Sequence, residues 1–366
     1  MRKTFILFAF IIMSFFVTHA QDWVNKYNSV DYFSEGLARV ELNDKWGFVN
    51  KSGNEVIPCK YDYVYDFSEG LAAVKIDNKW GFIDKTGKEV IPFKYDNVPW
   101  GFSEGLTAVK IDSKYGFVDK TGKEVVTCKY DDVAWIFSEG LAKVKLNDKW
   151  GFVDKTGKEV ITCKYNFTWG FSNGLAGAEI NGKWGFIDKT GKEVIPFKYD
   201  GVYGFLEGWA GVKINCNWGF IDKTGKEMIP CKYDNVYWKF SEGLFGVKLA
   251  GKWGFVNKSG KEVIPCKYEY IREFSEGLAG IKLNYNWGFI DINDKEVIPC
   301  KYADVYSFSE GLAAVKLNDK WGFIDKTGKE IIPIIYDKVK DFQSGKAKVT
   351  KDRITYFINT KGERVD

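Results

Sequence analysis

Short hydrophobic runs alternate with polar turns along the chain, and the same order of runs returns every 34 or 35 residues. In the copy at residues 61–94, the turns between the apolar runs are rich in Asp, Asn, Lys and Gly. This pattern predicts four strands, at residues 64–67, 71–76, 80–84 and 89–91. Pro92 is expected to end the fourth strand, because proline cannot donate to a ladder. No window of helical length has a 3.6-residue apolar period, so the sequence predicts an all-β protein.

Two motifs mark each copy of the repeat. A Phe-Ser-Glu-Gly turn or a close variant has its Phe at positions 33, 67, 102, 137, 171, 205, 240, 274, 308 and 342. A Trp-Gly-Phe or Tyr-Gly-Phe element begins at positions 46, 80, 115, 150, 184, 218, 253, 287 and 321. Its tenth copy is degraded to Thr355-Tyr356-Phe357, as expected of a terminal cap. After a leader at 21–26, the array occupies residues 27–366, with units starting near 27, 61, 95, 130, 165, 199, 233, 268, 302 and 336.

One such unit cannot bury its apolar face alone, so successive units must pack on one another. Two architectures satisfy this requirement. One is an open superhelical, solenoid-like stack of antiparallel meanders or hairpins, and the alternative is a closed β-propeller-like ring with one unit per blade. The period is short for a propeller blade, and no strand is visibly exchanged between the chain ends. The open stack is therefore the predicted fold.

A known repeat family shares these motifs. The run Lys-Trp-Gly-Phe-Ile-Asp-Lys-Thr-Gly-Lys-Glu-Val-Ile-Pro at residues 79–92, followed by Lys94-Tyr95-Asp96, resembles the WG (or KWG) repeat of bacterial proteins. The resemblance covers all ten units and departs from the pattern at Tyr115 and in the last unit. It implies β-rich repeats of variable copy number, often in exported proteins. It implies no catalytic residue, cofactor or particular ligand.

The first twenty residues are expected to be a signal peptide that is removed. Arg2 and Lys3 precede an apolar run at residues 5–17, and Thr18-His19-Ala20 supplies small residues for cleavage. The mature protein is then periplasmic, secreted or on the cell surface, with no membrane span after cleavage. His19 is the single histidine of the sequence. Its loss removes Ser-His-Asp and Cys-His chemistry, so we expect no enzyme, no metal site and no cofactor.

Charge gives no reason to expect nucleic acid as a partner. Lys and Arg total 53 against 49 Asp and Glu, for a formal net charge of +4. Nucleic-acid binding normally requires clustered basic charge. The hydrophobic fraction of 45% is ample for a folded core. We expect a folded protein that is monomeric.

Two rows of aromatic residues are candidates for a binding surface. The Trp of each Trp-Gly element is expected to be a buried anchor between units, because it is nearly invariant among the repeats. The row two residues before each turn Phe varies more, and its charged members Asp31, Arg272 and Lys340 indicate exposure. A stripe of exposed rings could bind a glycan or an extended peptide, although the same rings could simply cover the seam between units. The predicted binding residues are Tyr65, Trp100, Trp135, Trp169, Tyr203, Trp238 and Tyr306.

Cysteines and acidic residues also recur, and both have a structural interpretation. Six of seven cysteines share one repeat position with Phe93, Phe197 and Ile334, which is typical of apolar packing, so we expect free, buried thiols. Asp84-Lys85-Thr86-Gly87 and its copies are expected to form hydrogen-bonded turns, since each Asp is flanked by Lys. Calcium would need several converging oxygen ligands.

These observations favour an exported, non-catalytic repeat scaffold that binds a protein or a cell-envelope glycan through the variable aromatic row. The alternative is a purely structural component of the cell envelope. A cell-wall glycan hydrolase with paired carboxylates ranks third, because a catalytic pair would have to break the repetition, and the sequence contains no evident break.

Overall fold

The computed structural model describes residues 23–134, 137–237 and 239–365. The expected signal peptide and the predicted binding residues Trp135 and Trp238 lie outside these ranges. Within them, no helix is long and apolar enough to cross a membrane. The chain forms two compact units, Met1–Gly174 with Lys189–Gly191, and Leu175–Asp188 with Lys192–Asp366.

After the short 3₁₀ helix η1 (Val24–Lys26), the described residues form ten small sheets, here called blades and numbered in chain order. The strands of blades 1 to 5 are β1 (Ser29–Ser34), β2 (Leu37–Leu42), β3 (Lys45–Asn50), β4 (Glu55–Tyr61), β5 (Tyr63–Val64), β6 (Leu71–Ile76), β7 (Lys79–Asp84), β8 (Glu89–Tyr95), β9 (Leu106–Ile111), β10 (Lys114–Asp119), β11 (Glu124–Tyr130), β12 (Asp132–Val133), β13 (Leu141–Leu146), β14 (Lys149–Asp154), β15 (Glu159–Tyr165), β16 (Phe167–Thr168), β17 (Leu175–Ile180), β18 (Lys183–Asp188) and β19 (Glu193–Tyr199).

Blades 6 to 10 repeat this order. Their strands are β20 (Gly201–Val202), β21 (Trp209–Ile214), β22 (Asn217–Asp222), β23 (Glu227–Tyr233), β24 (Asn235–Val236), β25 (Leu244–Leu249), β26 (Lys252–Asn257), β27 (Glu262–Tyr268), β28 (Tyr270–Ser275), β29 (Leu278–Leu283), β30 (Asn286–Ile290), β31 (Glu296–Tyr302), β32 (Asp304–Val305), β33 (Ala313–Leu317), β34 (Lys320–Ile324), β35 (Glu330–Tyr336), β36 (Lys338–Val339), β37 (Lys346–Lys351), β38 (Ile354–Asn359) and β39 (Arg364–Val365).

Blade 2 shows how the repeat sequence builds a blade. Its strands pair antiparallel in the order β5-β6-β7-β8, so each strand lies beside the next in the chain. The first strand contains only two residues, whereas the predicted strand was four residues long at 64–67. The turn that follows has positive φ at both central residues, 52° at Glu69 and 87° at Gly70, which is typical of the hairpin turn that matches strand twist. In the third blade, the bridge Asn97↔Lys110 stands in place of the first strand.

The fourth strand of the blade does not end at the proline as predicted. β8 continues through Pro92 to Tyr95, and its register against β7 shifts so that the stretch from Ile91 to Tyr95 bulges opposite Gly81. A Cβ on Gly81 would lie 2.8 Å from the Ile91 carbonyl oxygen, so only glycine allows this approach. An outer strand has an unpaired edge, where proline is tolerated. In the Trp-Gly pair, the tryptophan ring is needed for packing and the glycine is needed for this close approach of two backbones.

The cores lie between successive blades. Ala73, Phe82 and Ile91 of blade 2 pack against Val98 and Val109 of blade 3 in one buried cluster. Equivalent clusters are found between later neighbours in both units, for example that of Leu244, Phe255, Ile264, Ile281 and Ile290. Each blade therefore shares its apolar surface with the next, as the repeat pattern predicted.

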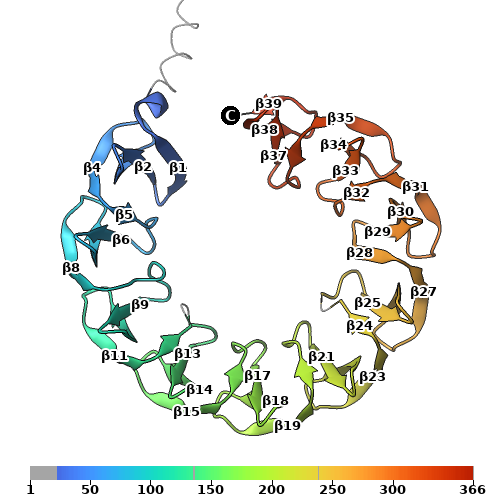
Figure 1. Cartoon of the computed structure of the whole chain (residues 1–366), viewed down its shortest axis with the longest axis horizontal. Coiled ribbons are helices and arrows are strands. Elements are labelled where there is room, and N and C mark those ends of the chain that lie inside the picture. The colour runs from blue at the N-terminus through green and yellow to red at the C-terminus, as the bar shows by residue number, and fades with distance from the viewer. Residues whose placement is uncertain (1–22, 135–136, 238, 366) are drawn as a thin grey trace, which may run out of the picture. The chain divides into compact units, whose positions relative to one another are not determined.

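The open superhelical stack predicted from the sequence is wrong. Each repeat is an antiparallel meander of the β-propeller type, four-stranded except in blade 3, where a bridge replaces the first strand, and this was the alternative interpretation. Within each unit the blades follow a curve, with the first strands on its inner side and the fourth strands on its outer side (Figure 1). Four strands fit into so short a period because the first strand of most blades has only two residues.

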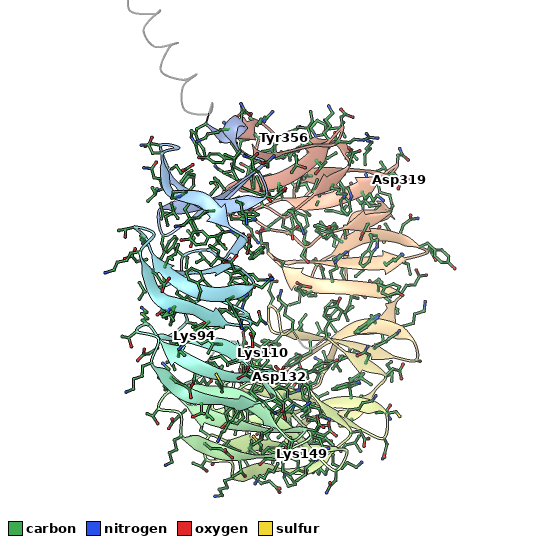
Figure 2. All side chains as sticks on the ribbon, turned by 60° about the vertical axis from the view of Figure 1, so that its left-hand side comes forward. Lys94, Lys110, Asp132, Lys149, Asp319 and Tyr356 are labelled. Atoms are coloured by element: carbon green, nitrogen blue, oxygen red, sulfur yellow. The ribbon has the colours of Figure 1, made fainter. Side chains whose placement is uncertain are left out.

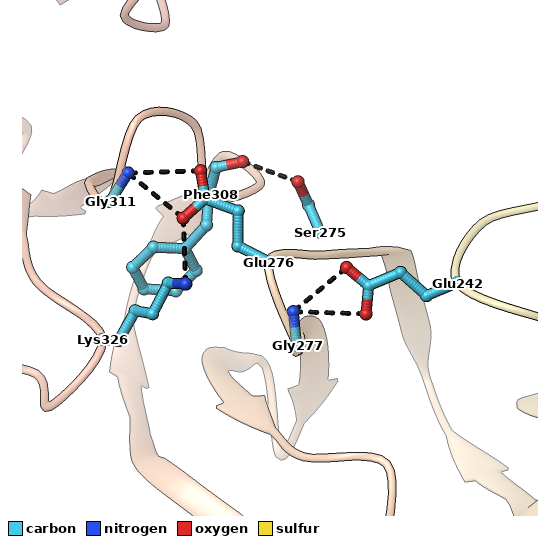
Figure 3. Close-up of polar contacts among 7 residues, drawn as sticks. All are labelled: Glu242, Ser275, Glu276, Gly277, Phe308, Gly311 and Lys326. Atoms are coloured by element: carbon cyan, nitrogen blue, oxygen red, sulfur yellow. Dashed lines mark hydrogen bonds and ion pairs between the residues drawn. The ribbon is translucent and has the colours of Figure 1, made fainter.

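Polar clamps join neighbouring blades at several of the Phe-Ser-Glu-Gly turns. In unit 2, the Ser275 hydroxyl donates to the Phe308 carbonyl at 2.7 Å (Figure 3). The Glu276 carboxylate accepts from the Gly311 amide at 3.1 and 3.2 Å and pairs with Lys326 at 3.1 Å. The preceding Glu242 accepts from the Gly277 amide at 3.0 and 3.2 Å in the same way (Figure 3).

The same clamp recurs in unit 1, where Glu69 accepts from Gly105 and pairs with Lys120 at 3.0 Å. Burial alone would raise the pKa of Glu69, but the Lys120 ammonium and the Gly105 amide hold it below its ordinary value. Glu69 is therefore kept ionised, and it holds the joint between blades 2 and 3.

Candidate binding face

The tryptophans of the Trp-Gly elements occupy the seams between blades, as predicted for anchors. Trp80, Trp253, Trp287 and Trp321 are buried, and Trp46, Trp150, Trp184 and Trp218 are half-buried. Tyr115 takes this place in blade 3, where the Lys110 ammonium lies 4.9 Å from its ring centre. Figure 2 labels Lys110 among the side chains of the blades. These rings hold blades together and expose little of their faces.

The variable aromatic row divides into two structurally different sets. In the first set the residue directly follows the inner strand and packs on the tryptophan of its own blade. Tyr65 stacks on Trp80 with ring centres 5.1 Å apart and planes 14° apart. Tyr203 stacks on Trp218 at 4.5 Å, and Tyr306 packs on Trp321 at 4.9 Å. We call this the stacking position, and at these three residues the row covers the seam.

The second set consists of residues inserted into the 35-residue repeats. In blade 3, Val98 is followed by Pro99 at the stacking position and then by Trp100, which has no counterpart in blade 2. The Trp100 side chain is 50% exposed, and its ring lies 6.1 Å from that of Tyr65. The row was defined from the sequence as the residue two positions before each turn Phe. This definition combined inserted residues such as Trp100 with residues at the stacking position such as Tyr65.

The remaining predicted residues follow from the same alignment. Tyr237, one residue before Trp238, occupies the stacking position of blade 7 and packs edge-on against Trp253 at 5.3 Å. Trp169 belongs to a 34-residue repeat, and its side chain is 42% exposed, 5.1 Å from the ring of Phe167. Of the predicted residues that are described, the structure thus brings Tyr65 and Trp100 together, while Tyr203 and Tyr306 lie in separate blades of unit 2.

Cations replace the stacked ring in several blades. Arg272 occupies the stacking position of blade 8, with its guanidinium 5.1 Å from the centre of Trp287. In blades 1 and 4 the cation comes instead from the second strand, where Arg39 lies 5.7 Å from Trp46 and Lys143 lies 4.5 Å from Trp150. Burial lowers the pKa of Lys143, whose ammonium donates to the Thr168 carbonyl at 2.9 Å.

A pairing of residue sizes explains which blade uses which solution. The amide at the stacking position donates to the carbonyl of the third residue of the second strand, as from Tyr203 to Gly211 at 2.9 Å. A Cβ on Gly211 would lie 2.9 Å from the Tyr203 ring, so a large stacked ring requires a small partner. Blade 4 reverses the sizes, with Ala134 donating to Lys143. Sequence comparison among the repeats, aligned on Val64 and its equivalents, contains this signal.

The recurrent acids and cysteines occupy packed or hydrogen-bonded positions. Asp84 accepts from the Thr86 amide at 2.8 Å and hydroxyl at 2.6 Å, and these bonds, the hydroxyl first, lower its pKa. All seven cysteines are free, as predicted. Cys216 is exposed and the other six are half-buried, so they are less buried than the sequence predicted. Burial raises the pKa of Cys128 to about 11, so its thiol stays protonated at neutral pH.

These features define a tandem-repeat protein built from β-propeller-type blades, with anchoring tryptophans in the seams. The family model for the WG containing repeat matches it ten times in succession, at residues 26–46, 46–80, 80–115, 115–150, 150–184, 184–215, 218–253, 253–287, 287–321 and 321–353. The chain belongs to the WG containing repeat family. None of the curated protein sequences matches it significantly.

Several solved structures show a distant likeness. A crystal structure of the eukaryotic initiation factor has 11% identity and a TM-score of 0.45, over 82% of this chain and 96% of that one. PorZ, a surface component of the type-IX secretion system of Porphyromonas gingivalis, has 10% identity and a TM-score of 0.28, over 91% of this chain. The extracellular domain of a hybrid two-component system of B. thetaiotaomicron has 10% identity and a TM-score of 0.30, over 93%. This chain spans 57% and 55% of the latter two, and likenesses this distant carry no functional conclusion.

Proposed function

We propose that this protein is an exported, non-catalytic scaffold that binds a protein or glycan partner through exposed aromatic residues on the inner side of unit 1. The observation that carries the proposal is Trp100, an inserted residue with half of its large side chain exposed. Burial of an indole ring is among the strongest contributors to binding at an interface. Trp169, which directly follows the inner strand of blade 5 and is 42% exposed, extends the proposed face.

The absence of catalysis is supported by where the ionisable groups are used. The recurring Glu69 and Asp84 positions accept hydrogen bonds from turns and neighbouring blades. The sequence without its first twenty residues contains no histidine to serve as a general base. Export is proposed from the apolar segment at residues 5–17 alone.

A purely structural role in the cell envelope is the second candidate, and one observation favours it. In the clamp, Glu276 binds Gly311 and Lys326 of the following blade. These recurring polar groups therefore hold blades together and are not left for a ligand. In a structural component, the exposed rings would bind no specific partner.

A pull-down from the cell-envelope fraction of the source organism separates the two candidates. The mature chain is compared with Trp100→Ala/Trp169→Ala, and with Tyr270→Ala/Tyr285→Ala as a control, since Tyr270 and Tyr285 are 58% and 83% exposed in blade 8. We expect a protein or glycan that is retained by the mature chain and the control, and lost from the first variant. Equal retention by all three proteins, each folded by circular dichroism, would contradict the proposed face.

A further inference from the structure

Five aromatic rings form a connected cluster across the first three blades of unit 1. The Tyr63 ring centre lies 6.1 Å from that of Trp46, 5.5 Å from that of Tyr65 and 5.9 Å from that of Trp80. Tyr65 in turn contacts Trp100 at 6.1 Å. The two residues that are most open to solvent are Tyr63, at 42%, and Trp100, at 50%. The cluster therefore presents two exposed rings on a base of packed ones.

Fixed polar groups lie beside this cluster. The Arg39 guanidinium, which covers Trp46, forms ion pairs with Asp31 at 2.7 Å and with Asp66 at 3.0 Å. The side chains of Asp31 and Asp66 remain 33% and 51% exposed, so their outer oxygens can accept further hydrogen bonds. Two carboxylates share one cation, which leaves the site with an excess of one negative charge. Their positions are set before any ligand arrives.

The backbone at this site is already engaged, which disfavours a peptide added as an extra strand. Arg39 donates to the Val64 carbonyl at 3.0 Å, and the Tyr65 amide donates to the Ala73 carbonyl at 2.8 Å. Peptides that bind by strand addition require unpaired backbone groups on the receiving strand. The inner strand of blade 2 has only two residues to offer.

We infer that blades 1 to 3 carry a subsite for a neutral carbohydrate chain, an inference that rests on the proposed function. Sugar rings have an apolar C–H face that packs on aromatic faces such as those of Tyr63 and Trp100, while their hydroxyl groups donate to carboxylates such as Asp66. The excess negative charge disfavours anionic glycans. Arg39 already occupies the ring cluster, which disfavours a cationic ligand.

Titration calorimetry of the mature chain with defined oligosaccharides tests the inference. The probes are the hexamers of β-1,4-linked glucose, β-1,4-linked N-acetylglucosamine and α-1,4-linked glucose, with hexagalacturonate as the anionic comparison. We expect saturable binding of at least one neutral hexamer and weaker or no binding of hexagalacturonate. Tyr63→Ala and Trp100→Ala should each weaken binding about tenfold or more, and Asp66→Asn about threefold.

Matched variants separate recognition from folding. Tyr270 occupies the same repeat position as Tyr63 in blade 8 and is 58% exposed, so Tyr270→Ala should leave the affinity unchanged. Tyr63→Phe and Trp100→Phe, which keep a ring, should restore most of the affinity lost in the alanine variants. Binding that survives both alanine substitutions, or no binding to any neutral hexamer, overturns the inference.

The outcome also separates this inference from the function on which it rests. A protein partner retained through Trp100, without affinity for any neutral hexamer, leaves the scaffold function standing and rejects the carbohydrate subsite. If neither a glycan nor a protein depends on Trp100 or Trp169, both proposals fail.

Discussion

Blades 2 and 3 differ by a single residue between the inner strand and the turn, and that residue changes what the aromatic ring does. In blade 2, Tyr65 directly follows Val64 and lies flat on the buried Trp80. In blade 3 the stacking position holds Pro99, and the additional Trp100 is half exposed. The comparison teaches that ring identity alone does not distinguish a seam residue from a surface residue in this repeat. Between blades 2 and 3, the number of residues after the first strand position makes the difference, although Trp169, which directly follows the inner strand of blade 5, is also 42% exposed.

Among the predicted changes, removal of the anchoring Trp80 should have the largest effect on stability. Trp80→Ala deletes a buried ring that contacts both Tyr63 and Tyr65, so we expect the free energy of unfolding to fall by about 3–5 kcal/mol. Urea denaturation followed by far-ultraviolet circular dichroism measures the change. A loss below about 1 kcal/mol would mean that the ring is not an anchor.

The pairing of sizes at the stacking position predicts a rescue in blade 6. Gly211→Lys should cost about 1–3 kcal/mol, because its Cβ would lie 2.9 Å from the Tyr203 ring. Adding Tyr203→Ala recreates the Ala134 and Lys143 arrangement of blade 4 and should recover part of that loss. Thermal unfolding of the single and double variants measures it, and a double variant less stable than Gly211→Lys alone would refute the pairing.

Stacking within blade 2 should give a measurable coupling. A double-mutant cycle of Tyr65→Ala and Trp80→Ala should show a coupling free energy of about 0.5–1.5 kcal/mol, as expected for a stacked aromatic pair. The same cycle with Trp100→Ala in place of Tyr65→Ala provides the control, because Tyr65 stacks directly on Trp80 at 5.1 Å, whereas Trp100 packs edge-on against Tyr65 at 6.1 Å. Equal coupling in the two cycles would contradict the division of the row.

Deletion of Trp100 should change stability little. The shortened sequence Val98-Pro99-Gly101-Phe102 has the length of Val202-Tyr203-Gly204-Phe205 in blade 6, which forms a complete blade. We expect the free energy of unfolding to stay within about 0.5 kcal/mol of the original, by urea denaturation, while binding through this face is lost. A large destabilisation would show that the inserted ring supports the fold.

The smallest predicted effect is in the response to acid. The Lys79 ammonium, then the Asp112 amide, hold the pKa of Asp96 below its ordinary value of 3.8. Its contribution to stability is therefore complete above about pH 4 and is lost as the pH falls through the lower, folded-state pKa. Asp96→Asn should flatten the dependence of the thermal midpoint on pH below about pH 4. An unchanged slope would contradict the linkage.

Much of the fold can be predicted from the sequence, because the motifs that mark turns and strand ends recur from repeat to repeat. The positions of Glu69 and Gly70 predict a turn, and the recurrence of Trp80 among the repeats predicts a buried anchor; the structure confirms both. The Asp84 turn likewise follows from Asp, Thr and Gly at fixed spacing. Local hydrogen bonding dictates these features, so they need no knowledge of neighbouring blades.

Features that depend on neighbours were harder to predict. The open stack was favoured because four ordinary strands need a longer period, and nothing in the sequence states that the inner strand shrinks to Tyr63–Val64. Pro92 was expected to end a strand that instead bulges past it. The aromatic row was treated as one column because it was counted from the turn Phe, so the roles of Arg39 and Lys143 as substitutes for a stacked ring were missed.

The clamp at the Phe-Ser-Glu-Gly turns has a consequence for how such a gene can change. The carboxylates of this clamp reach forward, as Glu242 does to Gly277 and Glu276 does to Gly311. A whole copy that is gained or lost by recombination between repeats therefore meets the same donor and acceptor at its new junction. Where both repeats carry this glutamate, copy number can change without leaving its charge unmatched, whereas blade 5 has Asn173 in its place.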